Sequence, residues 1–173
     1  AEDGIRDKLV TGVQTCALPI CGNANGGHIR FAASGTVRNY VGQATGFITS
    51  ASNTDLGLRA DGRILFATNG SAIDMQLDAS GNLGLGVTPS AWETLTAFQV
   101  KNASLSGYLN RMYLSANTYY GTGDFRYIAS DYATQYLQIS GEHRWLNSVS
   151  GTAGAAVRSE EHTSELQSLA YLV

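Results

Sequence analysis

Short stretches of alternating hydrophobic and polar residues, closed by turn-forming residues, dominate the middle of the chain. Leu56 to Thr68 places two such stretches around Asp61-Gly62, and Met75 to Thr88 repeats the arrangement around Ser80-Gly81-Asn82. Arg30 to Gly42 offers a third copy. Glycine accepts the positive φ that a tight hairpin turn requires, so each stretch predicts a β-hairpin. None of them has the i, i+3, i+4, i+7 spacing of a long helix.

One of these strands carries glycine on alternate positions. Leu83, Leu85 and Val87 alternate with two glycines and Thr88. Glycine buries no side chain and lets another backbone approach closely, while the leucine face of a lone hairpin is left without a partner. We therefore expect the hairpins to be completed only in a homotrimer, where three copies share their leucine faces about an axis.

A boundary follows the hairpins. Pro89 donates no ladder hydrogen bond, and beyond it Arg111–Tyr120 and Phe125–Ser140 form aromatic and β-branched runs joined through Gly121–Asp124. The pattern predicts an all-β chain. We expect an elongated shaft of β-hairpins at residues 22–88, a junction at 89–97 and a small Tyr-rich antiparallel β domain at 98–157.

The two ends of the chain differ from its middle. Lys8–Ile20 and Ser159–Ala170 can be encoded by opposite strands of one DNA sequence, read one frame apart, which unrelated protein segments have no reason to be. That DNA resembles a standard short-read sequencing adapter. We therefore expect residues 1–20 and 158–173 to be translated adapter, with Cys21 straddling the first junction. Ser159–Leu172 still has the capping serine and leucine spacing that predict a helix.

Removing these ends changes the charge balance. The chain carries a net charge of −3, all of it from the ends, and residues 22–157 hold eight basic and eight acidic residues. A neutral surface gives no electrostatic reason to expect nucleic acid as a partner. No apolar run approaches the roughly 20 residues of a membrane helix. Residues 22–157 contain no cysteine, so they offer neither a disulfide nor a thiolate zinc site.

Three segments in order resemble one family. "LDASGNLGLGVTPSAW" resembles the shaft-and-junction repeat of bacteriophage tail fibre and tailspike proteins, "TDLGLRADGRILFAT" the segment before it, and Tyr113–Val157 the small β domain that follows it. The resemblance implies a homotrimeric, non-catalytic virion structural protein of the phage tail, outside the cell during host attachment. Such a fragment displays or contributes to receptor binding, with a host-surface glycan as the partner.

Two other functions stay open as alternatives: a polysaccharide-depolymerising tailspike and a bacterial surface adhesin. A depolymerase needs two carboxylates about 5–10 Å apart across a cleft, and no spacing in the sequence selects such a pair. His28 and His143 belong to no ligand-spaced cluster. We expect no catalytic, metal or cofactor site. The acidic residues considered are Asp74, Asp78, Glu93, Asp124, Asp131 and Glu142.

Tyrosines gather in the second block. Aromatic faces stack on sugar rings, and a tyrosine combines an apolar body with a polar tip. The same alternation also places tyrosines in a domain or trimer core, which is the favoured interpretation. If the chain binds a ligand, we expect the contacts around the loop Asn117–Asp124, at Tyr119, Tyr120, Tyr132 and Trp145.

Overall fold

Strands form almost all of the regular structure, as the alternating pattern predicts. The computed structural model describes residues 27–162. Within this range the one helical segment is a single 3-10 turn, η1 (Ala44–Gly46). The protein is therefore all-β, and its chain divides into two compact units between Asp61 and Gly62.

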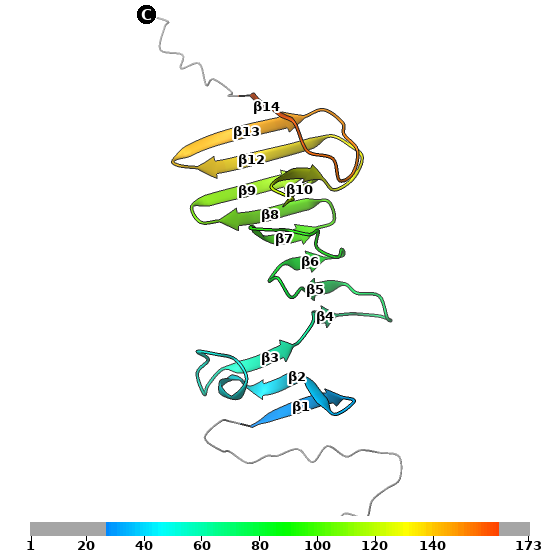
Figure 1. The fold of residues 1–173 in the computed structure, drawn as a ribbon, viewed down its shortest axis with the longest axis vertical. Helices are drawn as coiled ribbons and strands as arrows, with labels where there is room; N and C mark the ends of the chain where they lie inside the picture. Colours follow the sequence, from blue (N-terminus) through cyan, green and yellow to red (C-terminus); the bar gives the residue numbers. More distant parts are fainter. Residues whose placement is uncertain (1–26, 163–173) are drawn as a thin grey trace, which may run out of the picture. The chain divides into compact units, whose positions relative to one another are not determined.

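The first unit is a three-stranded antiparallel sheet in the order β1 (His28–Ala33), β2 (Thr36–Gln43) and β3 (Leu56–Ala60) (Figure 1). Ser34 and Gly35 join β1 to β2, and both have positive φ values, of 51° and 78°. Two consecutive residues of this conformation form the turn that suits the twist of a two-residue hairpin. The hairpin predicted over Arg30–Gly42 is confirmed.

One face of this sheet is covered by its own connecting segment. The ring of Phe47, just after η1, stacks on Tyr40 with centroids 5.2 Å apart and meets His28 edge-on at 5.4 Å. The guanidinium of Arg59 lies over the other ring of this stack, 5.1 Å from the centroid of Tyr40. The first unit thus has an aromatic face that the chain itself covers.

The second unit is built on a nine-stranded sheet in the order β14-β13-β12-β9-β8-β7-β6-β5-β4 (Figure 1). Neighbouring strands are antiparallel except β6 and β7, which are parallel. The bounds are β4 (Ile64–Phe66), β5 (Met75–Leu77), β6 (Leu83–Leu85), β7 (Thr96–Val100), β8 (Ala103–Tyr108), β9 (Arg111–Ala116), β12 (Ala133–Ile139), β13 (Glu142–Ser148) and β14 (Ser159–His162).

Residues on either side of the predicted junction share this sheet. Leu83 of β6 is in register with Phe98 of β7, so strands from 22–88 and from 98–157 are hydrogen-bonded neighbours. Residues 89–97 therefore do not interrupt the sheet. The division into compact units falls at Asp61 and Gly62.

The hairpin predicted around Asp61-Gly62 is wrong. β3 pairs with β2 in the first unit, whereas β4 pairs with β5 in the second. The Asp61 carboxylate lies 3.7 Å from the Arg38 guanidinium and 3.8 Å from that of Arg59, and its N–H donates to the Arg38 carbonyl. These contacts tie the end of β3 to β2, so the Asp-Gly pair serves as a connection between units.

The hairpin predicted over Met75–Thr88 is confirmed, with β5 and β6 antiparallel. The Asp78 carboxylate holds its turn by accepting hydrogen bonds from the backbone N–H groups of Ser80, at 2.9 Å, and Asn82, at 2.8 Å. Gly81 supplies the positive φ, of 86°. An aspartate that bonds to the backbone just ahead of it is a common turn device.

A second layer covers part of the large sheet. The two runs joined through Gly121–Asp124 are each divided into two strands. The parts next to the join, β10 (Thr118–Gly121) and β11 (Asp124–Tyr127), form a separate hairpin, and it packs over one face of the sheet, here called the inner face. The core lies between these layers. Its buried residues are Trp92, Leu95, Ala97, Tyr113 and Leu137, and Tyr119, Tyr120, Phe125, Ile139 and Leu146 pack against them.

The helix predicted within Ser159–Leu172 is wrong over its first four residues. Ser159–His162 is strand β14, antiparallel to β13. The outer edge of β13 presents unpaired backbone N–H and C=O groups that a further strand satisfies, and this outweighs a weak helical preference. The remainder of the predicted helix, like residues 1–26, lies outside the described residues.

Candidate functional site

One face of the nine-stranded sheet carries a continuous row of large hydrophobic side chains. Residues in register on neighbouring strands lie side by side on the same face. On eight strands, from β4 to β13, the residues of one such row are all aliphatic or aromatic. We call this row the apolar ladder; it comprises Ile64, Leu77, Leu83, Phe98, Leu105, Leu114, Tyr136 and Trp145.

A second row lies two residues away on the same face, here called the outer face. It is hydrophobic over its first six strands, and neither row contains a charged residue. No part of the described chain covers this face sufficiently to bury it: Leu105 is 45% exposed and Leu114 56% exposed. The second row comprises Phe66, Met75, Leu85, Val100, Ala103, Ala116, Thr134 and Asn147.

One row of the inner face differs from the apolar ladder in being polar and buried. Gln99 is fully buried, and its side-chain oxygen accepts hydrogen bonds from Ser90 N–H at 2.8 Å and Trp92 Nε1–H at 3.2 Å. Its Nε2 donates to the Lys101 carbonyl at 2.8 Å. Gln99 thereby fastens the segment after β6 onto the sheet. Its register neighbours on the inner face, all buried, are Gln76, Gly84, Ser104, Ser115 and Gln135.

Gly84 confirms the close backbone approach expected from its strand. A Cβ at this position would lie 2.3 Å from the Val87 carbonyl oxygen and 2.8 Å from Pro89 Cδ. The chain that follows β6 therefore folds back directly onto the glycine face of the hairpin. This covers the inner face and leaves the leucine face of the hairpin uncovered.

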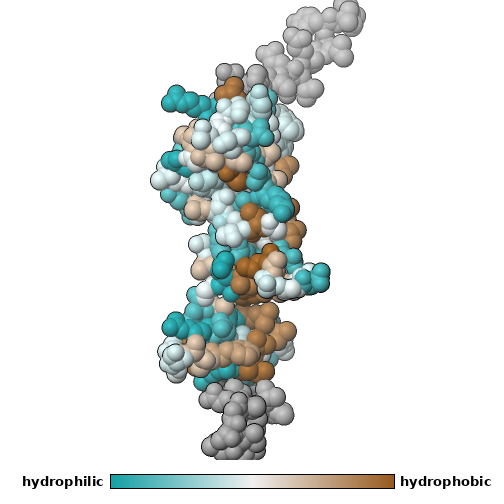
Figure 2. Space-filling model, turned by 90° about the vertical axis from the view of Figure 1, so that its right-hand side faces the viewer, coloured by the Kyte–Doolittle hydropathy of each residue, from teal (hydrophilic) through white to brown (hydrophobic). Residues whose placement is uncertain are grey.

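The first unit repeats this arrangement. Ile29, Val41 and Leu58 are in register on the face opposite the aromatic stack, and Leu58 is 46% exposed. Figure 2 shows hydrophobic surface (brown) over the three-stranded sheet and again at the level of β4–β6. Each unit thus covers at least part of one face of its sheet with its own chain and leaves a hydrophobic face open. Contiguous exposed hydrophobic surface of this kind marks an interaction site.

Two of the predicted ligand-binding residues pack against the core. Tyr119 and Tyr120, both on β10, are half-buried. The ring of Tyr119 meets Trp92 edge-on at 6.2 Å, and that of Tyr120 meets Phe125 edge-on at 5.3 Å. Their contacts are those of the hairpin layer with the sheet.

The other two predicted ligand-binding residues, Tyr132 and Trp145, lie outside the β10–β11 hairpin. Tyr132, in the loop before β12, is 67% exposed. Trp145 is 55% exposed and stands on the outer face, with its ring 4.5 Å from that of Tyr136. The structure therefore does not gather the four residues into one surface, and a glycan site formed by them stays a prediction. Alternation in the sequence does not distinguish a tyrosine on the hairpin layer from one on the outer face.

Each acidic residue that could serve in catalysis already has a hydrogen-bond or ion-pair partner. Asp78 holds its turn as described, and Glu93 accepts the Gly123 N–H at 2.9 Å. Asp124 and Asp131 each accept the N–H of the following residue, and Glu142 pairs with Arg144. Asp74 accepts bonds from the side chain and N–H of Thr68, which lower the pKa of its carboxyl. These carboxylates stabilise turns and strand ends.

The histidines stand apart from one another. His28 belongs to the aromatic face of the first unit, and the ring of His143, on β13, stacks on Tyr136 and shares a hydrogen bond with its hydroxyl. Among residues 27–162, no three His, Cys, Asp or Glu side chains gather closely enough to hold a metal ion. The same part of the chain has no helix long and apolar enough to cross a membrane.

Comparison of the chain with family models, with curated proteins and with solved structures finds no match. The candidate functional site is the uncovered outer face, because its row of hydrophobic side chains is exposed.

Proposed function

We propose that the chain is a segment of a homotrimeric bacteriophage tail fibre, a non-catalytic part of the virion that acts outside the cell during host attachment. It holds a receptor-binding tip away from the particle and contributes contacts to a host-surface glycan. The observation that carries this proposal is the apolar ladder. An exposed hydrophobic face of this kind favours association with other copies of the chain. The extension of the ladder across eight strands suits a fibre.

The shape of the ladder favours three copies around a common axis. It crosses eight strands but is only about two rows wide, and β4, β5 and β6 are three residues long. Two sheets that pack face to face bury broad faces. A narrow stripe is buried more completely when three copies meet around an axis parallel to it, which is a closed cyclic arrangement.

The ends of the chain are part of the same proposal. We interpret residues 1–20 and 158–173 as translated adapter, which makes β14 a chance pairing with the open edge of β13. Amplifying the source DNA with primers inside 22–157 and reading outward tests this. We expect a different coding sequence after Val157; recovery of the sequence encoding "RSEEHTSELQS" would contradict the interpretation.

Genomic context tests the function. We expect tail assembly genes beside the coding sequence in its source DNA, because virion structural genes of phages are grouped. Several independent source fragments without tail genes would count against a tail fibre. A signal peptide or cell-wall anchor encoded in the complete gene would favour a bacterial surface adhesin.

A further inference from the structure

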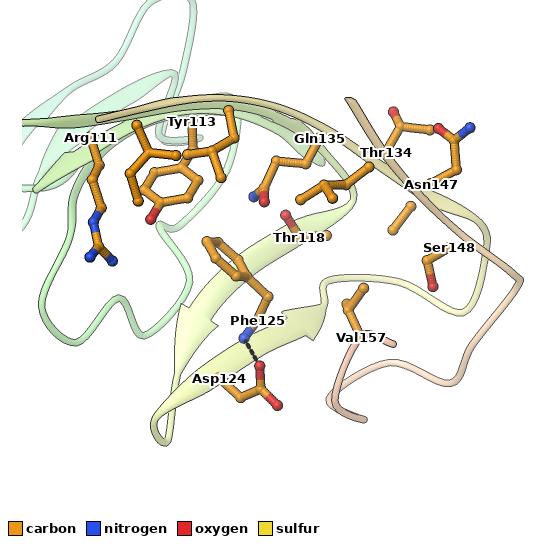
Figure 3. A pocket seen from close by; sticks show the side chains of 14 residues that line it. Arg111, Tyr113, Thr118, Asp124, Phe125, Thr134, Gln135, Asn147, Ser148 and Val157 are labelled. Carbon is orange, nitrogen blue, oxygen red and sulfur yellow. Dashed lines mark hydrogen bonds between the residues drawn. The ribbon is translucent and has the colours of Figure 1, made fainter. Parts of the chain in front are cut away.

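A cavity of about 210 Å³ lies between the inner face of the sheet and the β10–β11 hairpin. Figure 3 shows the strands of the sheet on one side and the hairpin on the other, with Tyr113 and Phe125 between them and Arg111 at one end. Two aromatic rings, Tyr113 and Phe125, and several aliphatic side chains give the cavity an apolar lining; the aliphatic residues are Ala133, Leu137, Ile139, Leu146 and Val157.

Two of the polar side chains that line this cavity are Thr118, from the hairpin, and Gln135, from the sheet. Thr118 is 2% exposed, and its hydroxyl has no hydrogen-bond partner among the described residues. Gln135 donates through Nε2 to Ser115 Oγ at 2.9 Å, which leaves its Oε1 to accept a further bond. Figure 3 shows both side chains directed into the space between the layers. A buried hydroxyl without a partner is costly, so an occupant that bonds to it is favoured.

The charges at the cavity favour a neutral occupant. Arg111 and Asp124 are the charged residues among those that line it, so their formal charges cancel. One Asp124 carboxylate oxygen already accepts the Phe125 N–H at 2.8 Å. A phosphate or a carboxylate would meet one cation and one anion, which gives it no net attraction.

We propose that this cavity binds one pyranose unit of a neutral glycan. A cavity of about 150 Å³ holds a benzene ring, so the volume here accommodates one six-membered ring with its substituents. Sugar hydroxyls both donate and accept, which matches the Thr118 hydroxyl and the Gln135 oxygen, while the C–H faces of the ring suit Tyr113 and Phe125. The biological role of this site rests on the proposed function; its position and ligand class rest on the cavity itself.

Titrations with free sugars test the proposal. The full chain is titrated separately with D-glucose, D-galactose, N-acetyl-D-glucosamine and D-glucuronate, with binding followed by saturation-transfer NMR. We expect saturable binding of at least one neutral sugar and weaker binding of glucuronate. Thr118→Val should weaken the affinity about fivefold, because it removes one neutral hydrogen bond and keeps the shape of the side chain.

Ser106→Ala is the matched control. The Ser106 hydroxyl is also buried on the inner face and has no hydrogen-bond partner within residues 27–162, but it does not line the cavity. It should leave the affinity unchanged. Binding of none of the neutral sugars, or equal affinity in parent and Thr118→Val protein, would overturn the proposal. The mass of the same sample separates the two proposals: a sugar-binding monomer supports the cavity and contradicts the fibre, whereas a trimer that binds no sugar does the reverse.

Discussion

Individual residues show where the chain tolerates no change of size. Gly151 packs against the ring of Tyr127, whose hydroxyl donates to the Val149 carbonyl at 2.7 Å and shares a hydrogen bond with Ser148. A Cβ on Gly151 would lie 2.1 Å from a carbon of that ring. The glycine is needed for this contact because it has no side chain, and no turn conformation is involved.

Gly151→Ala should therefore destabilise the protein by about 1–3 kcal/mol, the usual cost of overpacking a filled site. Urea denaturation measures it as a lowered midpoint with an unchanged slope. Gly62→Ala is the control, since a Cβ at Gly62 meets no atom within 4 Å. Equal midpoints for the two variants would show that Tyr127 does not pack on Gly151.

Tyrosines that look alike in the sequence have different surroundings in the fold. Tyr120 packs on Phe125, whereas Tyr132 is two-thirds exposed. Tyr120→Ala should lower the free energy of unfolding by about 2–4 kcal/mol through lost packing, and Tyr132→Ala should change it by less than about 0.5 kcal/mol. Thermal or urea denaturation compares them. A stable Tyr120→Ala variant that loses binding to a glycan array would favour the ligand role instead.

The positions of the strands were more predictable from the sequence than the pairing between them. The turns at Ser34-Gly35 and Asp78–Asn82 close hairpins as expected because their residues adopt the turn locally. Asp61-Gly62 carries an equally strong local signal, yet the arginines of the first sheet hold its aspartate and β4 pairs elsewhere. Turn residues specify a local conformation, and the pairing depends on long-range contacts that short patterns do not contain.

The burial of the polar row on the inner face was also not predictable from the sequence pattern. Gln99 reads as a solvent-facing position between Phe98 and Val100, but it is fully buried. Gln99→Leu should lower the free energy of unfolding by about 3 kcal/mol. The substitution removes the amide that forms hydrogen bonds with Ser90, Trp92 and Lys101, and leaves those groups without a partner in a buried site.

Gln138→Leu provides the comparison, since Gln138 is half-buried and makes one side-chain bond, to the Tyr136 hydroxyl at 3.0 Å. Gln138→Leu should lower the free energy of unfolding by less than about 1 kcal/mol. Chemical denaturation of both variants gives the difference in free energy. A Gln99→Leu protein as stable as the parent would mean that the segment Ser90–Trp92 is not held by this amide.

Across the whole molecule, the sequence did predict the open hydrophobic face. Leucines alternating with glycines in Leu83–Thr88 indicated a strand with backbone close to its glycine face and no partner for its leucine face. In the structure the backbone at Val87 lies against Gly84, and Leu85 is exposed. The extension of that face across eight strands was not predictable, because it follows from the parallel pairing of β6 with β7. The four predicted ligand-binding residues were grouped because aromatic residues are dense in that part of the sequence. Such density does not show on which face of a sheet each residue lies; the four are Tyr119, Tyr120, Tyr132 and Trp145.

Two residues of one strand test whether the outer face is an interface. Leu105 and Tyr108, both on β8, are 45% and 46% exposed on opposite faces of the sheet. Leu105→Glu should dissociate the proposed trimer, since it places a charge in a row that contains none. Tyr108→Glu should leave the assembly intact. Sedimentation velocity compares them, and equal sedimentation of both variants with the parent would show that the ladder is not the contact.

The mass of the protein in solution tests the central claim most directly. If copies of the chain cover one another's apolar ladders, light scattering after size exclusion should give a single species of three times the chain mass of 18.3 kDa. Its mass should fall only when the protein unfolds or the ladder is substituted. A monodisperse monomer of 18.3 kDa that unfolds cooperatively would contradict the account, since the open hydrophobic face would then be stable in water without a partner.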